Sequence, residues 1–96
     1  MNKRRRYKVH LQVNGRRIEE VVIDPHYAIK HPDIEDGIIL ELVQGLDGKE
    51  FQSQVREDEW EFFMLDRIGH RGKRYRLVWC LQDAEPLLGV INCFRR

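Results

Sequence analysis

The sequence predicts an α+β domain in which an N-terminal β-hairpin, a short helix and one longer helix pack on a mainly antiparallel sheet, in the order ββααββββ. Three observations predict it. The chain opens with alternating apolar and polar residues, its middle carries apolar residues at helical spacing, and its second half consists of short apolar runs separated by turn residues. A length of 96 residues fits one domain, with residues 1–6 as a flexible basic tail.

The hairpin is the first predicted element. Residues 7–13 alternate between apolar and polar side chains, which is the period of a half-buried strand. Asn14-Gly15 follows and is a strong hairpin signal, because both central positions of a type I′ turn need a positive φ. A return strand over residues 16–23 places Leu11 opposite Ile18.

A helical region is predicted after the hairpin. Asp24 is a favourable N-cap and Pro25 suits the first helical position, so a short helical turn begins there. It ends before Pro32, because the residue preceding a proline avoids the α region. The longer helix begins near Asp33 and ends near Gly45. Its apolar stripe faces the sheet and is formed by Ile34, Ile38, Ile39, Leu42, Val43 and Leu46.

The second half of the chain is predicted to be β-structure. Two runs, residues 62–65 and 77–79, are apolar at every position, which predicts central strands that are covered on both faces. Polar residues rich in glycine and charge separate the runs and are typical of turns. The four expected strands span residues 51–55, 60–68, 75–81 and 88–94.

Charge is strongly segregated although the net charge is only +1. Residues 1–18 carry seven Lys/Arg and no Asp/Glu, residues 19–66 carry three against fourteen, and residues 67–96 carry seven against two. Segregation of this kind concerns partners or solubility more than fold. Two interpretations follow: the basic ends pair with the acidic middle inside one domain, or a basic face is presented to RNA or to an acidic partner.

Composition also bears on cellular location and on metal binding. No apolar run approaches the ~20 residues of a membrane-spanning helix, and the basic N-terminus lacks the apolar stretch of a secretory signal. Cys80 and Cys93 both fall in apolar runs, which predicts buried, reduced thiols in a cytoplasmic protein. Neither the cysteines nor the histidines have the spacing of a zinc site, so no metal or cofactor is expected.

The run from Gly69 to Arg76 is the best candidate for contact with nucleic acid. Its arginines can bind phosphate through two parallel hydrogen bonds, and its tyrosine offers a ring on which a base can stack. A polar turn between two strands has the same composition, so both interpretations stand. The candidate nucleic-acid-binding residues are Arg71, Lys73, Arg74, Tyr75 and Arg76.

Two groups of motifs resemble those of BrnT-like domains, which belong to the RelE-like toxin superfamily and related small bacterial domains. The first group is His26-x4-His31, followed by Asp33-Ile34-Glu35-Asp36 and the helical residues Ile38, Ile39, Leu42 and Val43. The second group comprises Gly69-x-x-Gly72 and the runs 75–79 and 89–96. The resemblance covers residues 24–96. The chain departs from the family in its nearly neutral charge and in its N-terminal hairpin.

The resemblance implies a ribonuclease toxin of a toxin–antitoxin system that acts without a metal, or a diverged member that still binds RNA. It also implies RNA or the ribosome, and a cognate antitoxin protein, as partners. Cleavage needs groups that move protons at the 2′-hydroxyl and at the leaving oxygen, and cations for the charge that develops on the phosphate. The candidate catalytic residues are therefore His26, Lys30, His31 and Arg95.

Residues 23–32 also have a purely structural interpretation. Pro25 and Pro32 stand where a missing N–H costs nothing, which makes the segment a junction between hairpin and helix. On one helix, His26 and His31 lie about 140° apart, so both imidazoles aim at one phosphate only if the break at Pro32 reorients His31. The alternative to a toxin is accordingly a non-catalytic interaction or regulatory domain that docks a partner protein.

Overall fold

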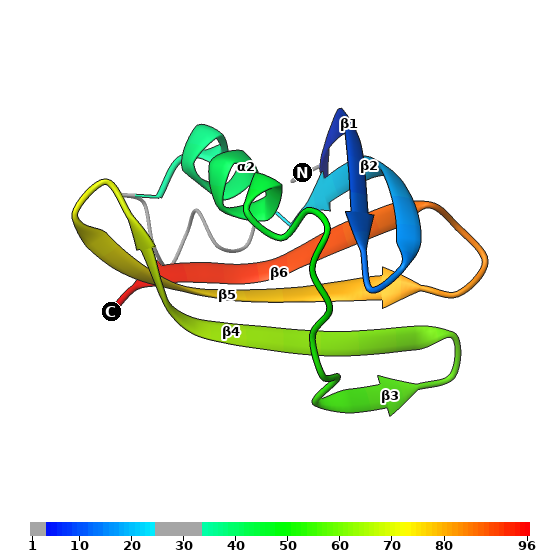
Figure 1. Cartoon of the computed structure of the whole chain (residues 1–96). Coiled ribbons are helices and arrows are strands. Elements are labelled where there is room, and N and C mark those ends of the chain that lie inside the picture. Colours follow the sequence, from blue (N-terminus) through cyan, green and yellow to red (C-terminus); the bar gives the residue numbers. More distant parts are fainter. Residues whose placement is uncertain (1–3, 25–33) are drawn as a thin grey trace.

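The computed structural model describes residues 4–24 and 34–96 (Figure 1). The strands among these residues form one six-stranded sheet in the order β1-β2-β6-β5-β4-β3. All neighbours are antiparallel except β2 and β6, which are parallel. The elements are β1 (Arg5–Val13), β2 (Arg16–Ile23), α2 (Asp36–Gln44), β3 (Val55–Glu57), β4 (Trp60–His70), β5 (Lys73–Gln82) and β6 (Leu87–Arg95).

The N-terminal hairpin is confirmed. Asn14 and Gly15 have φ values of 55° and 72°, the left-handed conformations that a type I′ turn requires. Leu11 is paired with Ile18, as the sequence predicts. The Asn14 side chain also accepts a hydrogen bond from the Phe51 N–H at 2.7 Å and donates one to the Phe51 carbonyl at 2.9 Å. These bonds fasten the hairpin turn to the segment that follows the helix.

The predicted α+β fold class, with two helices and the order ββααββββ, was wrong. The described residues are mostly β-structure and include a single helix of nine residues, α2. Ile34 and Leu46, the two ends of the predicted apolar stripe, are buried although both lie outside this helix. Burial of an apolar side chain does not require a helical backbone, so the stripe overstates the helix length. The predicted short helical turn lies outside the described residues.

The strands of the second half are present, with changed bounds. The strand expected over residues 51–55 forms only at Val55–Glu57, and the other three are longer than expected by one or two residues at their ends. The extension of β4 and β5 follows from their tight turn. His70 pairs directly with Lys73, and the turn residues Arg71-Gly72 have φ values of 51° and 78°. Backbone pairing continues through polar residues, which an apolar pattern does not reveal.

The parallel contact between β2 and β6 joins the two halves of the sheet. Val21 lies beside Leu88 and Ile23 beside Val90, so the N-terminal hairpin extends the antiparallel strands β3 to β6. Parallel strands need a long connection, and here it contains α2, β3, β4 and β5. This arrangement brings residues from the start of the chain next to residues from its end.

α2 lies against one face of the sheet, and the core forms between them (Figure 1). Trp79, at the centre of β5, is fully buried there. It stacks on Phe63 with ring centroids 5.4 Å apart and meets Phe51 edge-on at 5.2 Å. The buried strand residues of this covered face are Leu11, Val13, Ile18, Val21, Ile23, Phe63, Tyr75, Leu77, Trp79, Leu81, Leu88, Val90 and Cys93.

The opposite face of the sheet has no helix or strand lying over it in the described part of the chain (Figure 1). Among residues 4–24 and 34–96, no helix or strand therefore supplies the cover on this second side that the sequence predicts. We call this second side the uncovered face. It presents apolar and charged side chains together, which makes it the part of the molecule most suited to a ligand.

Candidate functional site

Strand alternation determines which residues reach the uncovered face. Successive side chains of a strand point to opposite sides of the sheet. Because Tyr75, Leu77 and Trp79 of β5 belong to the core, the intervening residues point to the uncovered face. Those residues and their partners on β4 and β6 are Arg74, Arg76, Val78, Cys80, Gln82, Trp60, Phe62, Met64, Leu87, Gly89, Asn92 and Phe94.

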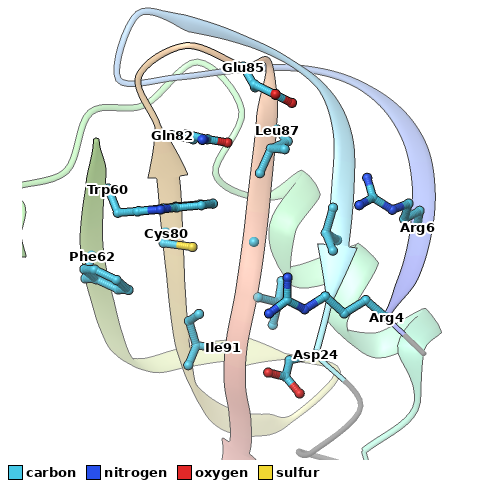
Figure 2. Close-up of a pocket in the computed structure, with 13 residues that line it drawn as sticks. Arg4, Arg6, Asp24, Trp60, Phe62, Cys80, Gln82, Glu85, Leu87 and Ile91 are labelled. Carbon is cyan, nitrogen blue, oxygen red and sulfur yellow. The ribbon is translucent and has the colours of Figure 1, made fainter. Parts of the chain in front are cut away.

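A groove of about 520 Å³ lies at one end of the uncovered face (Figure 2). Trp60 and Phe62 of β4 form one wall. Arg4 and Arg6, from the start of the chain, extend along the opposite side. Glu85 stands at the end of the groove, in the turn between β5 and β6. The groove therefore combines two aromatic rings on the β4 side with two cations on the β1 side, and its lining also includes the carboxylates of Asp24 and Glu85.

Gly89 lines the groove, and its backbone is paired with that of Cys80. A Cβ atom at this position would lie 2.8 Å from Cys80 Sγ, closer than real side chains approach. The thiol thus fills the space that a larger residue would need, and it is only 4% exposed. Burial raises the pKa of Cys80, with smaller opposing effects from the Gly89 N–H and the charge of Arg4. Near neutral pH, Cys80 is a packed, protonated thiol.

Arg4 and Arg6 are accessible to a ligand. Arg6 Nη1 lies 2.8 Å from Glu20 Oε1, and its side chain is 58% exposed. Arg4 is exposed and makes no ion pair with a residue that the structure describes. Exposed ion pairs contribute little stability, so an incoming anion can replace Glu20 at small cost. Both guanidinium groups can accordingly serve a phosphate or carboxylate at the groove.

A second cationic cluster lies at the other end of the uncovered face, around Asp66. Arg76 Nη2 and Arg96 Nε lie 3.0 Å and 2.9 Å from the two carboxylate oxygens of Asp66. The Arg76 guanidinium carbon lies 5.4 Å from the centroid of the Phe94 ring. The hydrogen bond from Arg76 lowers the pKa of Asp66, and the same bond raises the pKa of Arg76. Two arginines against one carboxylate leave this cluster positive.

The structure divides the residues of the predicted basic turn between the two faces. Tyr75 is 3% exposed and belongs to the core, so its ring is not open to stacking by a base. Arg71 is 77% exposed at the turn itself. Lys73 precedes Tyr75 by two residues and lies on the covered side. Arg74 and Arg76 lie on the uncovered face, where they share a surface with the groove.

The predicted catalytic residues are not brought together in the described structure. His26, Lys30 and His31 lie outside the described residues. Arg95 is exposed near the end of β6, and its backbone is paired with that of Tyr75. Paired residues point to the same face, so Arg95 lies on the side away from the groove. A role for these four residues in RNA cleavage stays a prediction.

Many charges of the basic ends pair with the acidic middle of the chain. Arg5 Nε and the Tyr7 hydroxyl each lie 2.5 Å from Asp36 Oδ2, which fastens β1 to the first turn of α2. The hydrogen bond to Asp36 raises the pKa of Tyr7. Three further pairs of this kind are Arg16 with Glu61, Arg71 with Glu41, and Arg76 with Asp66. Internal pairing thus accounts for much of the charge segregation.

The groove was not predicted from the sequence, because the residues that form its walls were assigned to a flexible tail and to a strand buried on both sides. Residues 1–6 are expected to be a flexible tail, whereas β1 begins at Arg5 and Arg6 is paired with Val22. Trp60 and Phe62 belong to a run that is apolar at nearly every position, a pattern typical of strands buried on both sides. The spacing of two residues indicates that Trp60 and Phe62 lie on the same face of the sheet. It does not show which face of the sheet the helix covers.

Within residues 4–24 and 34–96, no helix has the length and apolar character needed to cross a membrane. In the same residues no three His, Cys, Asp or Glu side chains are grouped to hold a metal ion. Cys80 and Cys93 are both buried, as predicted, and their sulfurs are not joined in a disulfide. Comparison of the chain with protein-family models, with curated proteins and with solved structures gave no match. A functional proposal therefore depends on the chemistry of the uncovered face.

Proposed function

We propose that this chain binds single-stranded RNA along the uncovered face of its sheet, as a diverged RNA-binding relative of the BrnT-like and RelE-like toxins. The observation that carries the proposal is the position of Trp60 and Phe62 across one groove from Arg4 and Arg6 (Figure 2). Aromatic rings stack on bases of any sequence, and arginines bind the phosphates between them. A cytoplasmic location, predicted from the two thiols, agrees with an RNA ligand.

The length of the uncovered face also supports an extended ligand. Arg74 lies six residues from Cys80 along β5, which is about 20 Å at the rise of a strand. Single-stranded nucleic acids occupy sites of roughly four nucleotides or more on comparable β-surfaces. Arg74 and the Asp66 cluster can therefore bind phosphates at one end while the groove holds a base at the other.

A different observation favours protein docking as the alternative function. Met64 and Ile91 are 39% and 41% exposed on the uncovered face or beside it. Exposed apolar side chains flanked by charge are typical of surfaces that bind another protein. Under this alternative, an antitoxin-like partner covers the apolar residues and pairs its acidic groups with the arginines.

Binding of a fluorescently labelled RNA oligonucleotide, measured by anisotropy across a salt series, tests the proposal. Trp60→Ala should weaken binding about tenfold, because stacking of a base on an aromatic ring contributes roughly 1–3 kcal/mol. Arg74→Glu should weaken binding and flatten its salt dependence. Lys73→Glu makes the matched charge change on the covered side of β5 and should have a smaller effect. The integrity of the RNA in the same samples measures cleavage.

Two outcomes would contradict RNA binding on the uncovered face. The first is equal affinity of the wild type, Trp60→Ala and Arg74→Glu, provided that all three keep the same melting temperature Tm. The second is an equal loss in Lys73→Glu and Arg74→Glu with no loss in Trp60→Ala. That result would place the contact at the turn between β4 and β5 instead.

A further inference from the structure

We propose that the groove is a subsite for one guanine nucleotide, with the base against Trp60 and the phosphate on Arg4 and Arg6. This inference rests on the proposed binding of single-stranded RNA and assigns a base preference to one end of that surface. It is carried by the size of the groove, by the arrangement of its polar groups around an apolar floor, and by the hydrogen-bonding character of Glu85 and Gln82.

The groove has the size and lining of a small-molecule site. Its volume of about 520 Å³ falls within the roughly 300–1,000 Å³ typical of such sites. Gly89 adds no side chain to the groove, and Cys80 Sγ occupies the space where its Cβ would lie. Trp60 extends from β4 across the groove, and Leu87 and Ile91 bound it along β6 (Figure 2). A planar base can thus lie between apolar surfaces.

The polar groups occupy separate parts of the groove. Arg4 and Arg6 lie on the side of β1 and β2, whereas Gln82 and Glu85 lie at the end where β5 turns into β6 (Figure 2). A nucleotide has a matching arrangement of groups. Its anionic phosphate lies at one end and the hydrogen-bonding edge of its base at the other.

Glu85 and Gln82 decide which base edge fits. An ionised carboxylate only accepts hydrogen bonds, and it accepts two in parallel. Guanine presents two adjacent donors, its N1–H and its N2 amino group, which match such a carboxylate. Adenine, cytosine and uracil each place an acceptor next to their donor on the same edge. The Gln82 amide can donate to the guanine O6, which completes the match.

Fluorescence of Trp60 gives a direct test. The chain has two tryptophans, so in a Trp79→Phe background the indole signal comes from Trp60 alone. This protein is titrated with GMP, AMP, CMP, UMP, guanosine and inorganic phosphate. GMP should quench the fluorescence of Trp60. It should bind at least about tenfold more tightly than AMP, because a bidentate hydrogen-bonded pair discriminates between bases by roughly that factor. Guanosine, which lacks the phosphate, should bind more weakly than GMP.

Two variants separate the base from the phosphate. Glu85→Gln should remove most of the preference for GMP over AMP while leaving the difference between GMP and guanosine unchanged. The double variant Arg4→Ala/Arg6→Ala should remove most of the difference between GMP and guanosine while leaving the preference for GMP over AMP unchanged. Equal binding of the four nucleotides, or a preference for GMP that survives Glu85→Gln, would overturn the guanine subsite.

An oligonucleotide of uridine alone separates failure of the subsite from failure of the proposed function. If it binds in a manner that depends on Trp60 and Arg74, while GMP shows no preference, RNA binding stands and the subsite is wrong. If neither oligonucleotides nor nucleotides bind, both proposals fail, and the uncovered face is better explained as a protein-docking surface.

Discussion

Trp79 and Trp60, the two tryptophans of the chain, lie on opposite faces of one sheet. Trp79 is fully buried between Phe63 and Phe51 under the helix-covered face. Trp60 stands in an open groove beside two arginines (Figure 2). The two residues come from adjacent strands with similar apolar content. A tryptophan in an apolar strand can therefore belong either to the core or to a binding surface, and the cover over its face decides which.

The largest expected effect comes from the core tryptophan. Trp79→Ala should lower the free energy of unfolding by about 3–5 kcal/mol, as the removal of large aromatic side chains from a core does. Urea unfolding followed by circular dichroism measures it. Trp79→Phe keeps most of the packing and removes an indole N–H that has no hydrogen-bond partner among the described residues, so it should cost less. A loss below about 1 kcal/mol in Trp79→Ala would mean that the covered face is loosely packed.

The next effect concerns the floor of the groove. Gly89→Ala should destabilise the fold by about 1–3 kcal/mol, because the new Cβ meets Cys80 Sγ and overpacks that site. Its backbone does not have a positive φ, so the cost arises from contact and not from conformation. Cys80→Ala/Gly89→Ala should recover part of the loss, which a double-mutant cycle measures. Additive costs in that cycle would show that the two side chains do not compete for the same space.

Trp60→Ala gives the direct contrast with Trp79→Ala. It should lower the free energy of unfolding by only about 1 kcal/mol, because the ring is partly exposed and leaves no closed cavity. The same unfolding experiment on both variants makes the comparison. If Trp60→Ala were as costly as Trp79→Ala, the uncovered face would be part of the core, and its use as a binding surface would be contradicted.

The smallest effect is a pH dependence at the Asp66 cluster. The pKa of Asp66 is lowered in the fold, so the ionised carboxylate stabilises the protein above the ordinary carboxyl pKa of about 4. That contribution is lost as the pH falls through the lowered pKa. Wild-type Tm should therefore decrease more on acidification than Tm of Asp66→Asn. Asp58→Asn, the same charge change in the β3–β4 turn, serves as the control. Parallel Tm curves for the wild type and Asp66→Asn would contradict this role.

Local features of the structure could be predicted because they depend on neighbouring residues. Asn14-Gly15 determines a type I′ turn through its backbone conformation, and that turn sets Leu11 opposite Ile18. The apolar stripe of α2 was also recognisable, although its ends were not, because burial at Ile34 and Leu46 does not require helix. The sequence alone identified the hairpin turn and the presence of α2, but not the bounds of that helix.

The candidate site could be predicted only in part. Arg74 and Arg76 were identified from composition, and strand alternation then places them on the uncovered face. The same alternation shows why a stacking role for Tyr75 does not fit, since Tyr75 shares its face with Trp79. Arg4 and Arg6, just before and within β1, were not identified as site residues, because the pairing of β2 with β6 that brings them to the groove joins distant parts of the chain.

The sequence by itself determined the hairpin turn, the alternation of each strand and the excess of basic residues at both ends of the chain. Each follows from backbone conformation or from composition over a few residues. The tertiary structure alone decided that α2 covers one face of the sheet and that the parallel β2–β6 contact sets Arg6 near Gly89 and, across the groove, Trp60. Such contacts depend on which apolar surfaces pack against another element of the fold. The residues of a strand are compatible with either face being packed or exposed.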